Sequence, residues 1–174
     1  VVIPDQPSAS ELQSALSLSA GLGNLTSSRL LMQLTTLGQL TGEQKASTNL
    51  ILVGKAASLP ILPELTLPIT LTGGQFQLDA GGEEDGVIAL VNSPWAPSKV
   101  VLVVSGNSDA ATVKAAQAVT TGLLRPNRAP NLALVATVDA TSLPVSVAID
   151  QTFADLGYSK NKMSRLGVNT ASYA

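Results

Sequence analysis

One run of residues constrains the fold more than any other part of the chain. Five consecutive apolar residues, Val100 to Val104, lead directly into Ser105-Gly106-Asn107-Ser108, where a helical pattern begins. A strand that is apolar without alternation is buried on both faces, which is typical of central strands in parallel sheets of α/β proteins. Ligands of such sheets usually bind where the strands end and the helices begin. The turn after Val104 is therefore the first place to look for a binding site.

Other apolar runs predict further strands around this one. We expect strands at residues 1–4, 29–35, 49–55, 75–78 and 87–91, and late apolar segments at 132–138 and 145–149. The run at 49–55 is continuous, like the one at 100–104, so it is also expected to be buried on both faces. Only eight residues, 92–99, separate the strand at 87–91 from the central one, and they include two prolines. This length is too short for a helical crossover of about ten residues or more, which predicts an antiparallel hairpin.

Capping residues predict two helices. Ser8 and Glu11 have the spacing of a capping box, which starts a helix that we expect to end at Gly21 or Gly23. Its apolar spacing predicts that one stripe is buried. The residues of this predicted stripe are Leu12, Ala15, Leu16 and Ser19. Ser108 caps a second helix over residues 109–123, and a short helical turn is expected at 42–48.

The connection at residues 58–71 contains Pro60, Pro63 and Pro68, which exclude a long helix. We expect this connection to be extended and to cross the edge or top of the sheet. Together these elements predict a three-layer α/β domain with a mostly parallel sheet and one antiparallel hairpin.

Composition excludes several classes of function. The 174 residues include no cysteine and no histidine, which removes thiol nucleophiles, imidazole bases and nearly every zinc or copper site. Only 13% of the residues are charged, the net charge is −2, and no basic cluster occurs, so nucleic acid is excluded as a partner. No apolar run approaches the roughly 18 to 20 residues of a membrane span. We expect no cofactor and no metal site.

The turn residues Ser105, Gly106, Asn107 and Ser108 have two interpretations. Their amides and hydroxyls could hold an anion or a sugar hydroxyl at a helix N-terminus. Alternatively they form only a tight turn, with Gly106 required by the backbone and Ser108 as the helix cap. FMN is rejected as a ligand, because the position after the first strand holds Asp5-Gln6-Pro7-Ser8 and no phosphate-binding composition.

Other candidate residues also have a plain structural alternative. Trp95, between Pro94 and Pro97, is either a stacking platform for a sugar or a partner, or a plug at the end of the hairpin. The acidic run from Glu83 to Asp85 lacks the ligand spacing of a calcium loop and the rigid separation of a glycosidase pair, so a solvated loop is expected. Asp155 is a lone carboxylate, and Lys55 and Arg125 are expected to be solubilising cations.

Several segments, in their order and spacing, resemble the flavodoxin-like module in the periplasmic regulatory B subunit of bacterial cellulose synthase. A later segment, 152–158, is similar to the first strand of the carbohydrate-binding-type β domain that follows this module in that family. The segments that carry the resemblance are Val2-Ile3-Pro4, Asn49-Leu50-Ile51-Leu52-Val53-Gly54, Asp85-Gly86-Val87 through Asn92-Ser93-Pro94-Trp95, Val101 to Asp109, and Thr152-Phe153-Ala154-Asp155-Leu156-Gly157-Tyr158.

The resemblance implies a flavodoxin-like domain at 1–145 and an incomplete β domain at 146–174. It also implies a non-catalytic accessory module that is exported and anchored in the membrane by a segment outside this chain. Its partners would be the catalytic cellulose synthase subunit, which binds cyclic di-GMP through a separate domain, other copies of itself, and the glucan polymer. We expect the chain to be a piece of a longer protein. Two alternatives stay open: a small-molecule or nucleotide-binding module that uses residues 105–109, and a hydrolase that relies on carboxylates alone.

Overall fold

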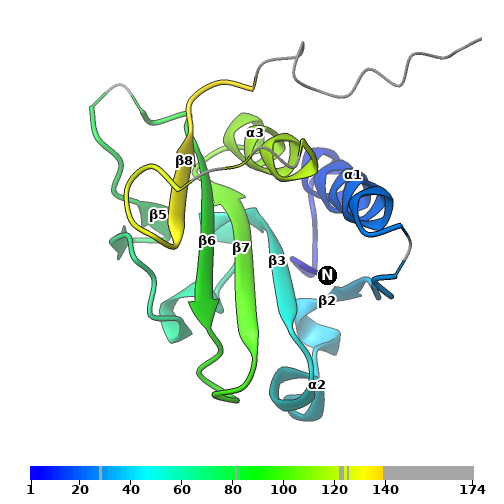
Figure 1. Cartoon of the computed structure of the whole chain (residues 1–174). Coiled ribbons are helices and arrows are strands. Elements are labelled where there is room, and N and C mark those ends of the chain that lie inside the picture. The colour runs from blue at the N-terminus through cyan, green and yellow to red at the C-terminus, as the bar shows by residue number, and fades with distance from the viewer. Residues whose placement is uncertain (28, 81, 122–123, 125, 139–174) are drawn as a thin grey trace, which may run out of the picture. The chain divides into compact units, whose positions relative to one another are not determined.

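The computed structural model describes residues 1–138, apart from residues 28, 81, 122–123 and 125, and these residues fall within one compact unit (Figure 1). The expectations for residues 139–174, including the β-domain segment at 152–158, its Asp155, and the domain boundary at 146, lie outside the described residues. The helices and strands are β1 (Val2–Ile3), α1 (Ala9–Leu25), β2 (Thr35–Thr36), α2 (Gly42–Ser47), β3 (Leu50–Lys55), β4 (Leu71–Thr72), β5 (Gln75–Phe76), β6 (Gly86–Asn92), β7 (Val100–Gly106), α3 (Asp109–Thr120) and β8 (Leu132–Val135).

The main sheet has six strands in the order β2-β1-β3-β7-β6-β8, and β4 and β5 form a separate hairpin. Strands β2, β1, β3 and β7 are parallel, while β6 runs antiparallel to both β7 and β8. The mostly parallel sheet and the antiparallel β6–β7 hairpin are thus confirmed. The two continuous apolar runs are neighbours in the middle of the sheet, where Leu50–Lys55 pairs with Val101–Gly106 along its whole length.

Helices α1 and α3 lie side by side over one face of the sheet (Figure 1). Their inward side chains are mostly small, and they pack on Val53 and Val104, which have no exposed surface. The two helices approach closely because α1 carries glycine at the crossing: a Cβ on Gly21 would lie 2.4 Å from Cγ2 of Thr120. A larger residue at this position would force the helices apart.

The opposite face of the sheet is covered by an irregular segment, residues 56–78, and no helix of the described chain longer than a single turn covers it. Leu59 and Leu62 of this segment are fully buried, and Phe76 closes the same cluster. The expectation that the segment crosses the edge or top of the sheet is therefore wrong. Its prolines do exclude a long helix, but its leucines bury enough apolar surface to form the third layer without one.

The capping box of α1 is confirmed, but the buried stripe of the helix differs from the prediction. Ser8 accepts from the N–H of Glu11, and the Glu11 carboxylate accepts from the N–H of Ser8. Glu11 also reaches inward to accept from the N–H of Lys55, so the helix turns the side of Glu11, Ser14, Ala15 and Leu18 to the sheet. As a result Leu12 and Leu16, which were expected to be buried, are exposed, and α1 continues through Gly21 and Gly23 to Leu25.

The strand expected at 29–35 is reduced to Thr35–Thr36. In the register with β1, Val2 lies opposite Thr35 and Ile3 opposite Thr36. The amino group of Val1 donates to the Gln33 carbonyl. Leu31 is 97% exposed in this segment. The helical turn at 42–48 is confirmed as α2, and it begins with its own capping box, made by Thr41 and Gln44.

The central strands should dominate the stability of the domain. Replacing the fully buried Leu52 with alanine removes methyl groups and leaves a cavity, so the free energy of unfolding should fall by about 2–5 kcal/mol in urea denaturation. The matched change Leu31→Ala removes the same atoms from an exposed site and should shift stability by less than about 0.5 kcal/mol. Equal losses for the two variants would contradict this packing.

Candidate functional site

Ser105 and Gly106 hold β7 against its neighbours. The buried Ser105 hydroxyl donates to the carbonyl oxygen of Gly54 on β3, with an Oγ–O distance of 2.6 Å. At Gly106 a Cβ would lie 2.4 Å from the Cβ of Ala111, so glycine is required where α3 crosses the end of the strand. Both residues of the predicted site therefore serve the packing of the sheet.

Asn107 and Ser108 fasten two distant segments to the same turn. The Asn107 amide accepts from the Phe76 N–H at 2.8 Å and donates to the Phe76 carbonyl at 2.9 Å, as a neighbouring strand would. The Ser108 hydroxyl accepts from the N–H of Ala111 at 3.1 Å, which caps α3, and donates to the Glu84 carboxylate at 2.6 Å. All four predicted turn residues lie together, and the side-chain hydrogen bonds of three of them stay within the domain. Whether any of them contacts a ligand stays a prediction.

A second polar cluster, consisting of Ser8, Glu11, Lys55 and Asp109, lies beside this turn. It gathers at the carboxyl ends of the parallel strands β1, β3 and β7, where ligands of open α/β sheets bind. The Ser8 hydroxyl donates to Asp109 Oδ1 at 2.8 Å, and Lys55 Nζ lies 3.1 Å from the same oxygen. Glu11, only 1% exposed, accepts from the backbone N–H groups of Ser8 and Lys55. The positive N-terminal ends of α1 and α3 thus face carboxylates of the protein itself.

Sequence reasoning found the two helix caps but missed the cluster. Each cap is a local pattern, whereas the contact between Ser8 and Asp109 joins residues 101 positions apart. Lys55 was expected to be a solubilising cation, but it forms the ion pair with Asp109. Arg125 lies outside the described residues. The signal available in the sequence was the position of all four residues at predicted ends of parallel strands or starts of helices.

Trp95 lies at the other end of the sheet, in the β6–β7 turn. Its side chain is half-buried against the core cluster that residues 56–78 form with the sheet. Its indole Nε1–H donates to Glu64 at 3.0 Å, and Lys45 Nζ lies 4.7 Å from the centre of the ring. Lys45 and Glu64 also approach each other, at 3.9 Å. The ring therefore packs against the core at the hairpin end and has a polar partner for its N–H, as buried indoles usually do, and whether it also contacts a sugar or a partner stays a prediction. It lies far along the sheet from the Ser105–Ser108 turn, so the candidate residues form two separate groups.

The acidic run from Glu83 to Asp85 forms a turn next to α3. The Asp85 N–H donates to the Gly82 carbonyl at 2.9 Å, and Glu84 bonds to Ser108. Within the described residues no group of three or more acidic, histidine or cysteine side chains is arranged to hold a metal ion. In the same part of the chain no helix is long and apolar enough to cross a bilayer.

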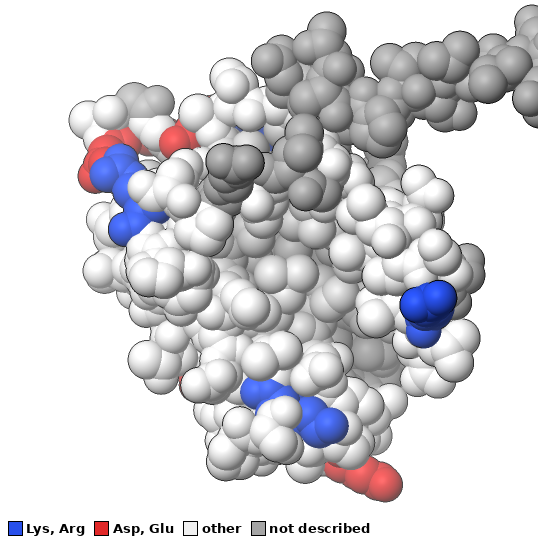
Figure 2. Space-filling model, viewed as in Figure 1, with Lys and Arg blue, Asp and Glu red and all other residues white. Residues whose placement is uncertain are grey.

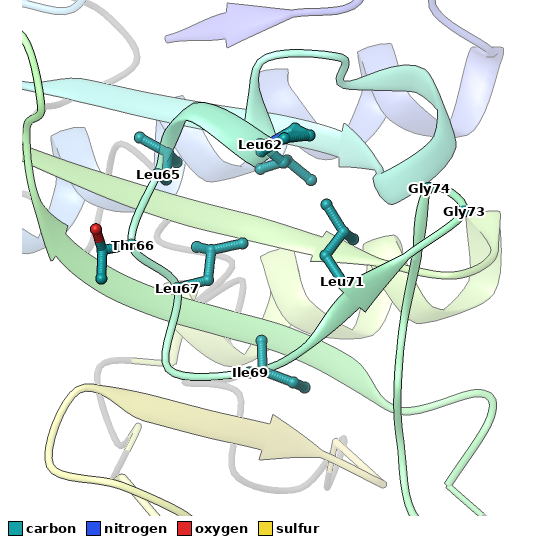
Figure 3. A pocket seen from close by; sticks show the side chains of 9 residues that line it. Leu62, Leu65, Thr66, Leu67, Ile69, Leu71, Gly73 and Gly74 are labelled. Atoms are coloured by element: carbon teal, nitrogen blue, oxygen red, sulfur yellow. The ribbon is translucent and has the colours of Figure 1, made fainter.

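A pocket of about 420 Å³ opens in the irregular layer, on the face of the sheet opposite α1 and α3. Figure 3 shows the loop running around this space, with Leu67 and Leu71 on opposite sides of it. The side chains that line it are apolar apart from Thr66 and none of them is charged, so the pocket offers no charged side chain to a phosphate or a metal ion. The lining residues are Leu62, Pro63, Leu65, Thr66, Leu67, Ile69, Leu71, Gly73 and Gly74.

Charged side chains are sparse on the surface as well. Figure 2 shows that the middle of the face seen in Figure 1 carries no charged side chain, and that the blue and red groups lie toward its margins. A protein that binds nucleic acid or an anionic membrane surface would gather Lys and Arg on one face. The face in view has no such gathering.

Asp109 should make stability depend on pH. The hydrogen bond from Ser8, and then that from Lys55, hold the pKa of the Asp109 carboxyl below its ordinary value. A lowered pKa in the folded state adds stability above the unfolded value, about pH 4, and this stability is lost as the pH falls through the folded pKa. The stability difference between the wild type and Asp109→Asn, measured by urea denaturation, should therefore be largest near neutral pH. It should vanish in acid, and a difference that stays constant across pH would contradict the assignment.

Comparison with known proteins identifies the family. Residues 1–131 match the family described as the first FD domain of the cellulose synthase subunit BcsB. No curated protein matches the chain. The match spans β1 to α3 and so includes both candidate groups, the turn with its polar cluster and Trp95. This chain belongs to the family of the first FD domain of cellulose synthase BcsB, as its flavodoxin-like sheet and its segments at 49–54 and 101–109 had indicated.

Proposed function

We propose that this domain is a non-catalytic scaffold module of a bacterial cellulose synthase regulatory subunit. In this role it binds protein neighbours, among them the catalytic subunit, and helps to guide the glucan across the envelope. It works on the extracytoplasmic side of the membrane, and the anchor is a segment outside this chain. Family membership supports the accessory role, because BcsB is the accessory subunit of the synthase and another subunit makes the polymer.

The observation that carries the proposal is the occupied carboxyl edge of the sheet. Open α/β sheets bind nucleotides at this edge through free amides and helix N-termini. Here Asn107 is bonded at both ends of its amide to Phe76, and Asp109, in the first turn of α3, accepts from the hydroxyl of Ser8, the cap of α1. A phosphate would have to displace a carboxylate that already holds two hydrogen-bond donors, Ser8 and Lys55. This favours the scaffold role over the nucleotide-binding alternative.

The chemistry available also disfavours an enzyme. Without histidine and cysteine, an acid–base pair would have to be built from carboxylates. Glycoside hydrolysis requires two carboxyl groups about 5–9.5 Å apart across a substrate cleft. The carboxylates of the described chain that lie near the turn are instead engaged: Glu11 with backbone N–H groups, Asp109 with Ser8 and Lys55, and Glu84 with Ser108.

Trp95 is the contact that we assign to the glucan or to a partner protein. An indole in a turn between two prolines loses little conformational entropy when another surface stacks on it. The ring is half-buried and Lys45 Nζ lies over it, 4.7 Å from its centre, so the surface on offer combines an aromatic ring with a cation.

Calorimetric titration with FMN, cyclic di-GMP and cello-oligosaccharides tests this proposal. Neither nucleotide should give a saturable heat, because the edge of the sheet is occupied. Binding of either nucleotide that is lost in Asn107→Ala would overturn the scaffold role and establish the nucleotide-binding alternative. Cello-oligosaccharide binding that is lost in Trp95→Ala and kept in Trp95→Phe would support the glucan contact, since phenylalanine retains an aromatic face.

A further inference from the structure

The solvent side of the Trp95 ring is covered by a cation. Lys45 Nζ lies over the ring, 4.7 Å from its centre, which is inside the roughly 6 Å within which an ammonium is attracted to an indole face. The ring itself packs against the core cluster that residues 56–78 form with the sheet. An ammonium stays near water unless it is fully compensated, and the Lys45 side chain is 24% exposed. Lys45 therefore covers the ring from outside.

Glu64 contacts both the ring and its cover. Its Oε2 accepts from the indole Nε1–H at 3.0 Å and lies 3.9 Å from Lys45 Nζ. Lys45 belongs to α2 and Glu64 to the single-turn helix Leu62–Glu64. Helix α2 and the β6–β7 turn lie at the same end of the sheet (Figure 1). Three segments that are distant in the chain thus bring a cation, a carboxylate and an aromatic ring together.

The turn that carries the ring is fixed. The Trp95 N–H donates to the hydroxyl of the buried Ser93 at 3.3 Å, and the Ser93 N–H donates to the Lys99 carbonyl at 2.8 Å. Pro94 and Pro97 restrict the backbone on either side of the tryptophan. A ligand therefore meets the ring in one position, and the ring does not turn to expose its covered face.

The Lys45 side chain, by contrast, is free to move. Its four-carbon stem is flexible, and an ion pair as open as this one, with the Glu64 side chain 50% exposed, contributes little to stability. If the ammonium leaves the ring, the Glu64 carboxylate is still within its reach, so the charge keeps a partner. What is lost is the attraction between the ammonium and the ring.

We propose that Lys45 is a movable cover of the Trp95 ring, and that a neutral glucan stacks on the ring after the ammonium has swung aside toward Glu64. Stacking requires the ring face that Lys45 occupies, so the cation and the sugar compete for it. Lys45 thereby sets the affinity of this contact. The inference deepens the proposed function and rests on the assignment of Trp95 to the glucan, but the cover itself is testable without a ligand.

Quenching of fluorescence by acrylamide tests the cover, because Trp95 is the only tryptophan of the chain. Acrylamide is neutral, and it should quench Lys45→Ala about twofold more strongly than the wild type, since the lysine stem and ammonium no longer shield the ring. Lys45→Arg keeps a cation that stacks on aromatic faces, so it should be quenched like the wild type. Lys114→Ala removes the same charge from α3 and should also leave quenching unchanged.

Two results of the quenching experiment would overturn the proposal. One is equal quenching of the wild type and Lys45→Ala, which would mean that Lys45 does not shield the ring. The other is quenching of Lys45→Arg as strong as that of Lys45→Ala, which would mean that the loss of the native side chain, and not of the cation, exposes Trp95.

Titration with cellohexaose, followed by the fluorescence of Trp95, tests the competition. Lys45→Ala should bind about two- to fivefold more tightly than the wild type, the factor that corresponds to a cation–π attraction of about 0.5–1 kcal/mol. Equal or weaker binding by Lys45→Ala would overturn this inference and leave Trp95 as a glucan contact. Absence of binding by both proteins would instead overturn the glucan contact, and this inference with it.

Discussion

The pairing of β3 with β7 is the constraint on which the rest of the domain depends. Both strands are apolar on both faces, so neither face can be left to water. The two faces are covered in different ways: helices α1 and α3 cover one face, and the proline-containing segment 56–78 covers the other. Gly21 lets α1 approach α3 closely in the helical layer. The two hydrogen bonds between the Asn107 side chain and the Phe76 backbone attach the other layer to the end of β7.

The carboxyl edge of the sheet shows how such a domain can serve as a scaffold. In an α/β sheet that binds a nucleotide, the helix N-termini at this edge face the phosphate. Here Asp109, in the first turn of α3, accepts from the Ser8 cap of α1, and the buried Glu11 carboxylate accepts from the N–H groups of Ser8 and Lys55. These contacts stabilise the junction of β1, β3, α1 and α3 without a ligand. The fold and the site are separable properties, so a flavodoxin-like sheet does not require a flavin.

Much of the fold could be predicted from local patterns, and the failures have physical causes. The continuous apolar runs, the capping box of Ser8 and Glu11, the Ser108 cap and the short hairpin connection are local features, and each predicted its element correctly. The strand at 29–35 was predicted too long, because the apolar spacing of this segment does not mark a buried strand: of its residues the β1–β2 ladder includes Thr35, and Leu31 is 97% exposed. The buried side of α1 was wrong because a charged residue, Glu11, is buried to meet a backbone N–H 44 residues away, against the usual preference of glutamate for the surface.

The position of the candidate turn could be predicted from neighbouring residues, but its role depends on residues that are distant in the chain. The sequence Ser-Gly-Asn-Ser after a buried strand predicts the turn and the cap, because both are properties of neighbouring residues. What the turn contacts depends on Gly54, Phe76 and Glu84, which lie far from it in the chain. A ligand and an internal partner demand the same polar groups, so the sequence alone leaves both interpretations open.

Native-state hydrogen exchange at two amides tests most directly whether side chains of the domain itself hydrogen-bond the backbone groups at the carboxyl edge of the sheet. The N–H groups of Lys55 and Phe76 are the backbone donors to Glu11 and Asn107, respectively. If these contacts are part of the stable core, both amides should exchange within about tenfold of the central amides of β3 and β7. Exchange of both amides at the rate of an exposed loop would contradict an edge occupied by the protein itself.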